Sequence, residues 1–251
     1  MRMQLNSVGI IILSAGRGTR MKSDKAKALH KINDKPMILR VAQTAKNVAG
    51  DCIVFVIGHQ AEQVKKTVSD FGDFIFAYQH EQLGTGHAVS CALPFLPDYV
   101  NDVVILSGDV PLLTSETVFR LIKDHKSAKR DLSLLAVNVD NPEGYGRVFY
   151  DENMNVTSIV EEADANIEQK SVKIVNSGIY CVDKEFLSSS LKKIDSDNSQ
   201  KEYYLTDIIQ IGYFEGKKVG ALVSDDYEEV VGVNSLNDLK KAECILANRI
   251  K

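Results

Sequence analysis

A glycine-rich loop flanked by cations stands close to the start of the chain. It covers residues 13–21, reads Leu-Ser-Ala-Gly-Arg-Gly-Thr-Arg-Met, and is followed by Lys27. Glycines let backbone N–H groups approach phosphate oxygens without an intervening Cβ, and Arg20 and Lys27 are able to neutralise phosphate charge. Taken alone, the loop indicates a phosphate site, with a plain turn beside a solvated run of cations as the alternative.

Two other phosphate-binding loops do not fit these residues. A dinucleotide-binding loop needs a third glycine that opens a helix, but this chain has Met21 there, followed by Lys-Ser-Asp. A P-loop needs GxxxxGK(S/T), which the chain lacks. The loop therefore does not predict an NAD-dependent dehydrogenase or a P-loop enzyme.

Asp109 is the carboxylate that best suits a metal. It follows the apolar run 103–106 and a Ser-Gly pair, and Pro111 forces an extended exit beyond it. Mg²⁺ prefers hard oxygen ligands and keeps waters beside one or two protein ligands and substrate phosphates. In isolation, a turn or helix-cap role explains Asp109 equally well. The four cysteines and five histidines have no metal-binding spacing, so no zinc centre is predicted.

The elements that must position these residues alternate regularly. Apolar runs predict strands over 8–13, 52–57, 74–78, 103–106 and 132–139, and helical patterns lie between them at 36–48, 61–68, 86–93 and 115–125. Such alternation predicts an α/β fold with a Rossmann-like, open, mixed but mostly parallel sheet flanked by helices. Ligands bind beyond the carboxyl ends of such strands, which is where the loop and Asp109 fall.

The pattern changes after Asn141-Pro142. We expect a hairpin of strands 146–150 and 156–161, a strand over 173–182 interrupted at 176–178, helices over 186–194 and 205–214, a strand over 219–223 and a closing helix over 235–249. We expect a single domain over 1–251, with a nucleotide-binding half to about residue 140. Residues 141–251 then form a smaller lobe that supplies the pocket of the second substrate.

Bulk properties exclude several classes of protein. The net charge of −4 and the absence of a basic stripe argue against nucleic acid as the main partner. The chain has neither an apolar run of membrane-spanning length nor a secretory segment before the first strand. We therefore expect a cytoplasmic protein with no membrane partner.

The motifs together resemble the sugar-nucleotide pyrophosphorylases, whose signature the loop and Lys27 match. Six later segments occur in the order found in one branch, the uridyltransferase domain of the bacterial bifunctional N-acetylglucosamine-1-phosphate uridyltransferases. They read EQLGTGHA at 81–88, GYGR at 144–147, IVE at 159–161, NSG at 176–178, EYYLTD at 202–207 and GVN at 232–234. The resemblance extends over essentially the whole chain.

The resemblance implies a reaction of UTP with N-acetylglucosamine-1-phosphate that gives UDP-N-acetylglucosamine and pyrophosphate for cell-envelope precursors. It implies Mg²⁺ as the cofactor, Asp109 and Asn234 as its ligands, and Arg20 and Lys27 as catalytic cations. The smaller lobe, residues 141–251, is then a sugar-binding lobe that also completes the metal site. The alternatives are a related transferase that uses glucose-1-phosphate or another base, and a non-catalytic nucleotide-binding module.

The resemblance also implies two sets of substrate contacts, with Gln79 and the Gly84-Thr85 turn at the uracil. The nucleotide side comprises Leu13, Ser14, Ala15, Gly16, Gln79, Gly84, Thr85, Ser107 and Gly108. The sugar side comprises Gly146, Glu161, Asn176, Tyr204 and Thr206. For Tyr204 and Thr206, simple packing at a helix start is the alternative.

The chain departs from the family pattern at several points. Ser14 and Ser107 replace a frequent Ala and Tyr at the nucleotide side, Arg17 replaces a frequent Lys, and Ala26 stands where a Pro often precedes the lysine. The hexapeptide repeats of the family's C-terminal β-helix do not occur in this sequence. Acetyltransferase activity is therefore not carried over, and because members trimerise through that β-helix, a monomer is compatible with the sequence.

Overall fold

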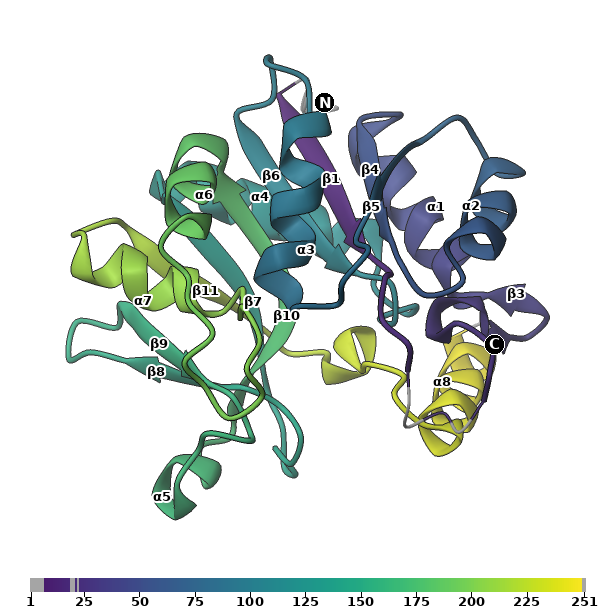
Figure 1. The fold of residues 1–251 in the computed structure, drawn as a ribbon. Coiled ribbons are helices and arrows are strands. Elements are labelled where there is room, and N and C mark those ends of the chain that lie inside the picture. The colour runs from purple at the N-terminus through teal and green to yellow at the C-terminus, as the bar shows by residue number, and fades with distance from the viewer. Residues whose placement is uncertain (1–6, 19–20, 22, 250–251) are drawn as a thin grey trace.

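A large sheet forms the centre of the molecule (Figure 1). The computed structural model describes residues 7–18, 21 and 23–249. The main path of the sheet runs in the order β11-β7-β10-β6-β1-β4-β5. These strands are β1 (Val8–Leu13), β4 (Ile53–Ile57), β5 (Ile75–Tyr78), β6 (Asp102–Ser107), β7 (Leu132–Asn138), β10 (Ile174–Asp183) and β11 (Val219–Ser224).

The sheet is mixed and mostly parallel, as the sequence predicts. β1 pairs in parallel with β4 and β6, β4 with β5, and β7 with β11. β10 runs antiparallel to both of its neighbours, β6 and β7. The hairpin of β8 (Arg147–Tyr150) and β9 (Val156–Val160) branches from β10, and β2 (Lys31–Ile32) pairs separately with β3 (Lys35–Pro36).

Helices cover both faces of this sheet (Figure 1). On one face, α1 (Met37–Ala49), α2 (Ala61–Ser69) and α4 (Ser115–Ala128) pack against Ile10, Ile12 and Phe55. On the other, α3 (Thr85–Ala92), α6 (Lys184–Leu191) and α7 (Asp207–Phe214) pack against Ile11 and Val54. Successive strand residues face opposite layers, and both layers are apolar, so these strands read as continuous hydrophobic runs.

Several elements differ from the expectations. The segment 173–182 is one strand, β10, and its predicted interruption is a register shift between Asn176 and Tyr180. The short helix α5 (Ile167–Lys170), the 3₁₀ turns η2 (Lys27–Leu29), η3 (Leu93–Phe95) and η4 (Tyr227–Val230), and the β2–β3 hairpin were not predicted. Elements this short carry too few residues for a periodic pattern.

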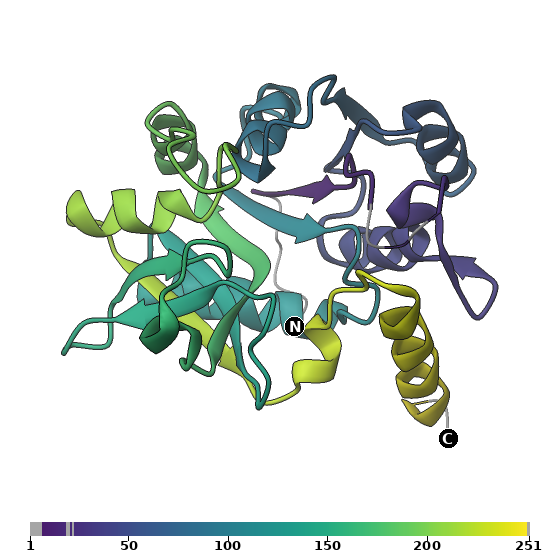
Figure 2. The same cartoon turned by 60° about the horizontal axis from the view of Figure 1, so that its bottom comes forward.

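The strand β10 and the closing helix both join the second half of the chain to the first. β10 lies between β6 and β7, so the sheet continues across the expected boundary near residue 140. The closing helix α8 (Leu236–Arg249) packs beside the β2–β3 hairpin, in a small core that contains Met21, Ile32 and Met37 (Figure 2). Among the described residues, no helix has the length and apolar character needed to cross a bilayer.

Candidate active site

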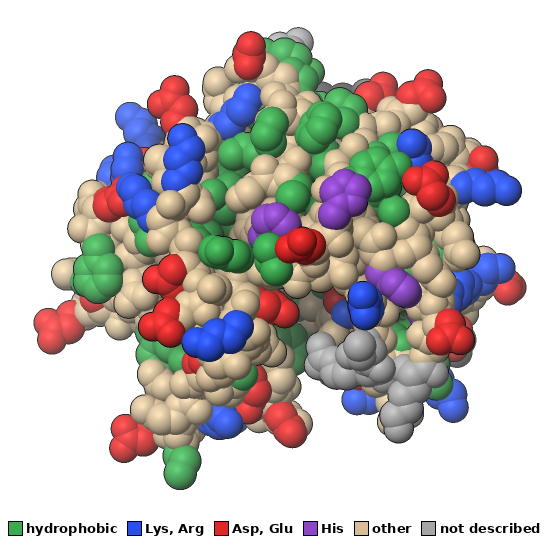
Figure 3. Space-filling view, in the orientation of Figure 1, with side chains coloured by type: hydrophobic (Ala, Val, Ile, Leu, Met, Phe, Trp, Pro, Cys, Tyr) green, Lys and Arg blue, Asp and Glu red, His purple; other side chains and the backbone are tan. Residues whose placement is uncertain are grey.

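A cleft opens beyond the carboxyl ends of β1 and β6. Its larger part has a volume of about 940 Å³ and adjoins a smaller part of about 270 Å³. Leu13, Thr85, Ser107 and Asp109 line both parts, so the two are continuous. Acidic and basic side chains are interspersed over the face of the molecule shown in Figure 3. The cleft thus lies beyond the carboxyl ends of the strands, where open α/β sheets bind their ligands.

The smaller part collects the whole predicted nucleotide side. Its lining includes Leu13, Ser14, Ala15, Gly16, Gln79, Gly84, Thr85, Ser107 and Gly108. Ser14 Oγ donates a hydrogen bond to the carbonyl of Val56 at 2.7 Å, so this hydroxyl is turned into β4 rather than toward the cleft. The backbone N–H of Gly108 donates to the carbonyl of Leu13 at 2.8 Å, which fixes the ends of β1 and β6 side by side.

The glycine loop brings Lys27 back toward the end of β1. Gly18 has a φ of +67°, and a Cβ there would lie 2.6 Å from the Cβ of Lys27, so a side chain at this position would displace the lysine. Among the described residues, no atom outside the adjacent loop residues lies within 4 Å of a Cβ built on Gly16, which leaves space for a ligand to approach its backbone. Arg20, the other predicted cation, lies outside the described residues.

Lys27 meets both predicted metal ligands. Its Nζ donates to a carboxylate oxygen of Asp109, and to Oδ1 of Asn234 at 2.6 Å. The side chains of Lys27 and Asp109 are 16% and 25% exposed, so this cluster opens to the cleft. The backbone N–H of Val233 donates to the carbonyl of Asp109 at 2.8 Å. The ends of β6 and of the segment before α8 are therefore held together.

The chemistry of this cluster suits Mg²⁺. A carboxylate oxygen and an amide oxygen converge on one point, where a cation, the lysine ammonium, lies between them. Within the described part of the chain, no three His, Cys, Asp or Glu side chains group in a way that could hold a metal. Two hard oxygen ligands, completed by waters and phosphates, are the kind of set that Mg²⁺ accepts.

Asn234 does not supply the cap of α8. Ser235 Oγ accepts a hydrogen bond from the N–H of Asp238 at 3.2 Å, and the Asp238 carboxylate accepts from the N–H of Ser235 at 2.9 Å. This reciprocal pair satisfies the first turn of the helix. Ser235 therefore takes the capping role that was the alternative explanation for Asn234.

Gln79 lies at the inner wall of the nucleotide side. It is only 3% exposed, and its Nε2 donates to the carbonyl of Gly84 at 3.0 Å. Gly84 has a φ of +114°, and a Cβ there would lie 2.6 Å from the carbonyl oxygen of Tyr203. The Thr85 hydroxyl accepts from the N–H of Leu205 at 3.0 Å. The turn at residues 84–86 is thus attached to the segment 203–205 of the second half.

The larger part of the cleft collects four of the five predicted sugar-side residues. Gly146, Glu161, Asn176 and Thr206 line it. Thr206 Oγ1 donates to Glu161 at 3.2 Å, and burial raises the pKa of the Glu161 carboxyl. Asn176 Nδ2 donates to the Tyr180 hydroxyl at 2.7 Å. A Cβ on Gly146 would lie 2.7 Å from Ile159 Cγ2 and 3.2 Å from a carboxylate oxygen of Glu161, so glycine allows the backbone at this position to lie close to both residues.

Tyr204 is placed differently. It is not among the described residues that line either part of the cleft, its side chain is 8% exposed, and its hydroxyl bonds to Gln200 Oε1 at 3.0 Å. Its position corresponds to the packing alternative rather than to direct contact with a ligand.

Gln60 is a supporting residue that sequence reasoning did not find. Its Oε1 accepts from the N–H of Ala26 at 2.7 Å, and its Nε2 donates to the carbonyl of Asp24 at 2.7 Å. It therefore holds the loop immediately before Lys27. Nothing in the local pattern of residues around Gln60 signals this role, because its partners lie more than 30 residues away in the chain.

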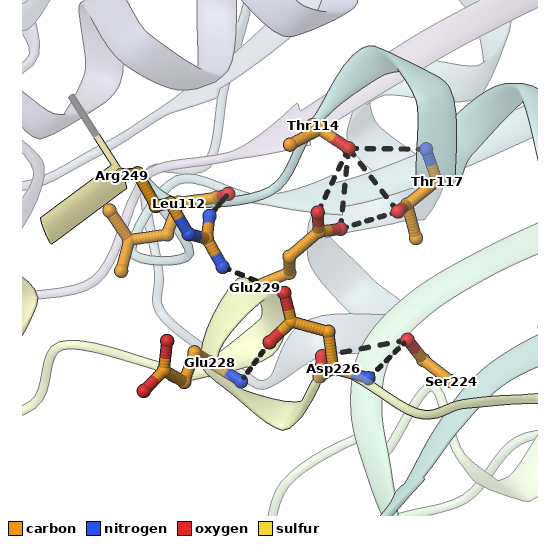
Figure 4. A network of polar contacts seen from close by, with 8 residues as sticks. All are labelled: Leu112, Thr114, Thr117, Ser224, Asp226, Glu228, Glu229 and Arg249. Carbon is orange, nitrogen blue, oxygen red and sulfur yellow. Dashed lines mark hydrogen bonds and ion pairs between the residues drawn. The ribbon is translucent and has the colours of Figure 1, made fainter. Parts of the chain in front are cut away.

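A second supporting network fixes the segment that carries Asn234 (Figure 4). The Glu229 carboxylate, on η4, accepts from Thr114 Oγ1 at 3.2 Å and from Thr117 at the start of α4. Arg249, the last residue of α8, donates to Asp226 at 2.9 Å and to the carbonyl of Leu112 at 3.1 Å. Contacts on both sides of Asn234 thus attach this segment to the body of the protein.

Comparison with known proteins identifies the relatives of this chain. The family model described as Nucleotidyl transferase matches residues 9–243. The bifunctional protein GlmU of Geotalea daltonii is 44% identical over 243 residues, which are 97% of this chain and 53% of that protein. The bifunctional protein GlmU of Caldanaerobacter subterraneus is 45% identical over 240 residues, 96% of this chain and 52% of that protein. The chain therefore spans about half the length of these relatives.

The fold also has counterparts among solved structures. HddC from Yersinia pseudotuberculosis, in a crystal structure with GMP-PN, superposes with a TM-score of 0.70 over 95% of this chain and 99% of that one. At 21% identity this similarity shows the α/β fold alone. Because the family model covers most of the sequence, the chain belongs to the nucleotidyl transferase family.

Proposed function

We propose that this nucleotidyltransferase transfers a uridylyl group from UTP to N-acetylglucosamine-1-phosphate, and releases pyrophosphate. The product is UDP-N-acetylglucosamine, a cell-envelope precursor, and the proposed site of action is the cytoplasm. The observation that carries the proposal is the convergence of Lys27, Asp109 and Asn234 at one point of a continuous cleft. The identity of about 44% to GlmU proteins supports the choice of substrates.

We assign the two parts of the cleft to the two substrates. The smaller part, with Gln79 and the Gly84-Thr85 turn, offers the amide, backbone and hydroxyl groups that a uracil requires. The larger part offers Glu161, Asn176 and Thr206 to the sugar hydroxyls and the acetamido group. Asp109 lies at their junction, where the two phosphate groups would meet.

The proposed reaction is an in-line displacement at phosphorus. A phosphate oxygen of the sugar-1-phosphate attacks the α-phosphorus of UTP, the bond to the β-phosphate oxygen breaks, and pyrophosphate leaves with its electron pair. The nucleophile is already an anion, so no general base is needed. Catalysis then rests on positioning and on charge neutralisation.

The chain's own residues account for much of that neutralisation. Lys27 would screen the repulsion between the two anionic substrates, and Arg20 is proposed to assist from the glycine loop. Asp109 and Asn234 would hold Mg²⁺. When bound, the ion adds positive charge at the phosphates. For the ion to bind there, the Lys27 ammonium must move off Asp109, and the α-phosphate is its natural new partner.

The test is pyrophosphate release from UTP and Mg²⁺ with a panel of sugar-1-phosphates, and from other nucleoside triphosphates with N-acetylglucosamine-1-phosphate. We expect the highest kcat/KM for UTP with N-acetylglucosamine-1-phosphate. EDTA should abolish release, and added Mg²⁺ should restore it. A higher kcat/KM with glucose-1-phosphate or with another base would contradict the substrate assignment, and full activity in EDTA would contradict the metal assignment.

A further inference from the structure

Three side chains contact one another in a row behind the nucleotide side of the cleft. They are Gln79, His87 and Cys91, two of which lie one turn apart on α3. Gln79 Nε2 lies 3.2 Å from Nδ1 of His87, and Nε2 of His87 lies 3.7 Å from Sγ of Cys91. We infer that His87 is a positioning residue that fixes the Gln79 amide and thereby sets the preference for uracil. The inference rests on the proposed function, in which Gln79 faces the base.

The orientation of the Gln79 amide follows from its neighbours. Its nitrogen lies 3.0 Å from the carbonyl oxygen of Gly84, and a carbonyl oxygen can only accept a hydrogen bond. The NH₂ group must therefore be on that side, and its second N–H is directed to His87. Both donors of the amide are used within the protein, so Oε1 is the group left for the cleft.

An amide oxygen at this position discriminates between pyrimidines. Uracil presents the N3–H donor between two carbonyls, and Oε1 of Gln79 is a matching acceptor. Cytosine presents an N3 lone pair at the same position, which would face another lone pair. A rotation of the amide by 180° would reverse this preference, so the contacts that prevent the rotation determine specificity.

The same geometry fixes the state of His87. Because its Nδ1 faces an N–H donor, Nδ1 must act as an acceptor, and the ring proton is then on Nε2. Nε2 points toward Cys91, whose sulfur is a weak acceptor. His87 is partly buried, and it follows the turn that carries Gly84 and Thr85. It is therefore attached to the same short segment that reads the base.

The experiment measures equilibrium binding of UTP and CTP, each with Mg²⁺ and without a sugar-1-phosphate, together with steady-state kinetics. In His87→Leu we expect UTP binding to weaken about 5- to 10-fold, the size expected for one lost hydrogen bond. The preference for UTP over CTP should fall by a similar factor. KM for UTP should rise while kcat changes less than about twofold, because the reacting phosphorus is not touched.

Two conservative variants keep the test independent of folding. The amide oxygen of His87→Asn can stand close to the position of Nδ1, whereas the longer side chain of His87→Gln cannot place it there. The first should retain the preference for UTP, and the second should lose it. Ser90→Ala is the matched control, because Ser90 is exposed on the same helix and its hydroxyl donates to the helix's own backbone, at the carbonyl of Gly86. It should bind both nucleotides as the unsubstituted chain does.

The outcomes separate this inference from the proposed function. A UTP to CTP binding ratio unchanged in both His87→Leu and His87→Gln would overturn the role of His87. Absence of turnover with every sugar-1-phosphate would instead contradict the proposed reaction, while the binding ratio would still report on His87. If Gln79→Ala leaves the ratio unchanged, Gln79 does not read the base, and the role of His87 fails with it.

Discussion

In the proposed reaction, Lys27 is the residue at which the two substrates meet. Its ammonium contacts Asp109 and Asn234, so in the structure it occupies the point where their oxygens converge. A lysine on a flexible stem can exchange these partners for a phosphate without movement of the backbone. Substitutions of Lys27 and of Asp109 should therefore have different effects, although the two side chains touch each other.

We predict that Asp109→Asn lowers kcat/KM by about 100-fold or more and raises the Mg²⁺ concentration needed for half-maximal rate. Lys27→Ala should lower kcat/KM by a similar factor without raising that Mg²⁺ concentration, because removal of the ammonium leaves both oxygens to the metal. The free energy of unfolding should change by at most about 3 kcal/mol in either variant, since the pair is mostly buried but reaches the cleft.

The measurements are pyrophosphate release over a range of Mg²⁺ concentrations and unfolding in urea. Lys31→Ala is the matched control, because Lys31 is an exposed lysine on the nearby β2. Turnover close to that of the unsubstituted chain in either site variant would show that the assigned roles are wrong.

Asp207 leads to a prediction about stability and pH. Burial, and then the carboxylates of Asp195 and Asp164, raise the pKa of Asp207 from 3.8 to about 6. The folded state thus favours the protonated carboxyl. The folded state is therefore stabilised in full below the unfolded pKa of 3.8. As the pH rises through about 6, Asp207 ionises, and its buried charge becomes a penalty on the free energy of unfolding.

Asp207→Asn removes this penalty, because Asn carries no charge at any pH. At pH 7 we expect the variant to be more stable than the unsubstituted chain by about 1 kcal/mol, a value reduced from the full shift because the side chain is partly exposed. The difference should disappear below about pH 4. Urea unfolding from pH 4 to 8 measures it, with the exposed Asp73→Asn as control. An advantage that is constant with pH would contradict the explanation.

The sequence points to candidate site residues that lie in recognisable motifs, but it does not point to the residues that hold them in place. Asp109 and Lys27 have side chains that suit phosphate chemistry and lie in recognisable motifs. Gln60 and Glu229 act through partners distant in the chain, so no local pattern could identify them. Ser14 was also undetermined, since only the fold shows its hydroxyl bonded to β4.

At the scale of elements, local patterns predicted most strands and helices. The apolar run of β1 is continuous because both of its faces are buried, and α1 is capped at its C-terminus by Gly50, which has a φ of +62°. The position of β10 was not predicted. It pairs antiparallel with β6 and β7, which begin 72 and 42 residues earlier in the chain, and such non-local pairing has no signature within the strand itself.

The η4 segment makes a prediction of its own. Glu229 attaches it to the start of α4, and Asn234 follows four residues after η4 ends at Val230. Glu229→Gln replaces hydrogen bonds to a carboxylate by weaker ones. We expect the Mg²⁺ concentration for half-maximal rate to rise about threefold or more, because Asn234 is then held less firmly.

Pyrophosphate release at varied Mg²⁺ measures this effect. Glu228→Gln is the control, since it makes the same change of charge on η4, while Figure 4 shows the Glu228 side chain directed away from the network. Equal Mg²⁺ dependence of the two variants would mean that the network does not position Asn234.

At the scale of the whole molecule, the two halves share their sheet and their core. Separation near residue 140 would remove β10 from between β6 and β7 and expose an edge on each. It would also remove α8 from the core that contains Met21 and Met37. We therefore propose that the chain is one folding unit, although its cleft has two parts.

This proposal predicts a single unfolding transition that is the same in both halves. The chain has no tryptophan, so single reporters can be introduced at exposed aromatic positions, Tyr78→Trp on β5 and Phe214→Trp at the end of α7. Urea midpoints from the two fluorescence signals should coincide with each other and with the circular dichroism midpoint of the unsubstituted chain. The circular dichroism of each variant shows whether its tryptophan disturbs the fold.

If the Phe214→Trp signal changed at a lower urea concentration while β5 remained folded, the second half would be a separate unit. Because β10 has partners from the first half on both sides, we expect unfolding of either half to remove the support of the other.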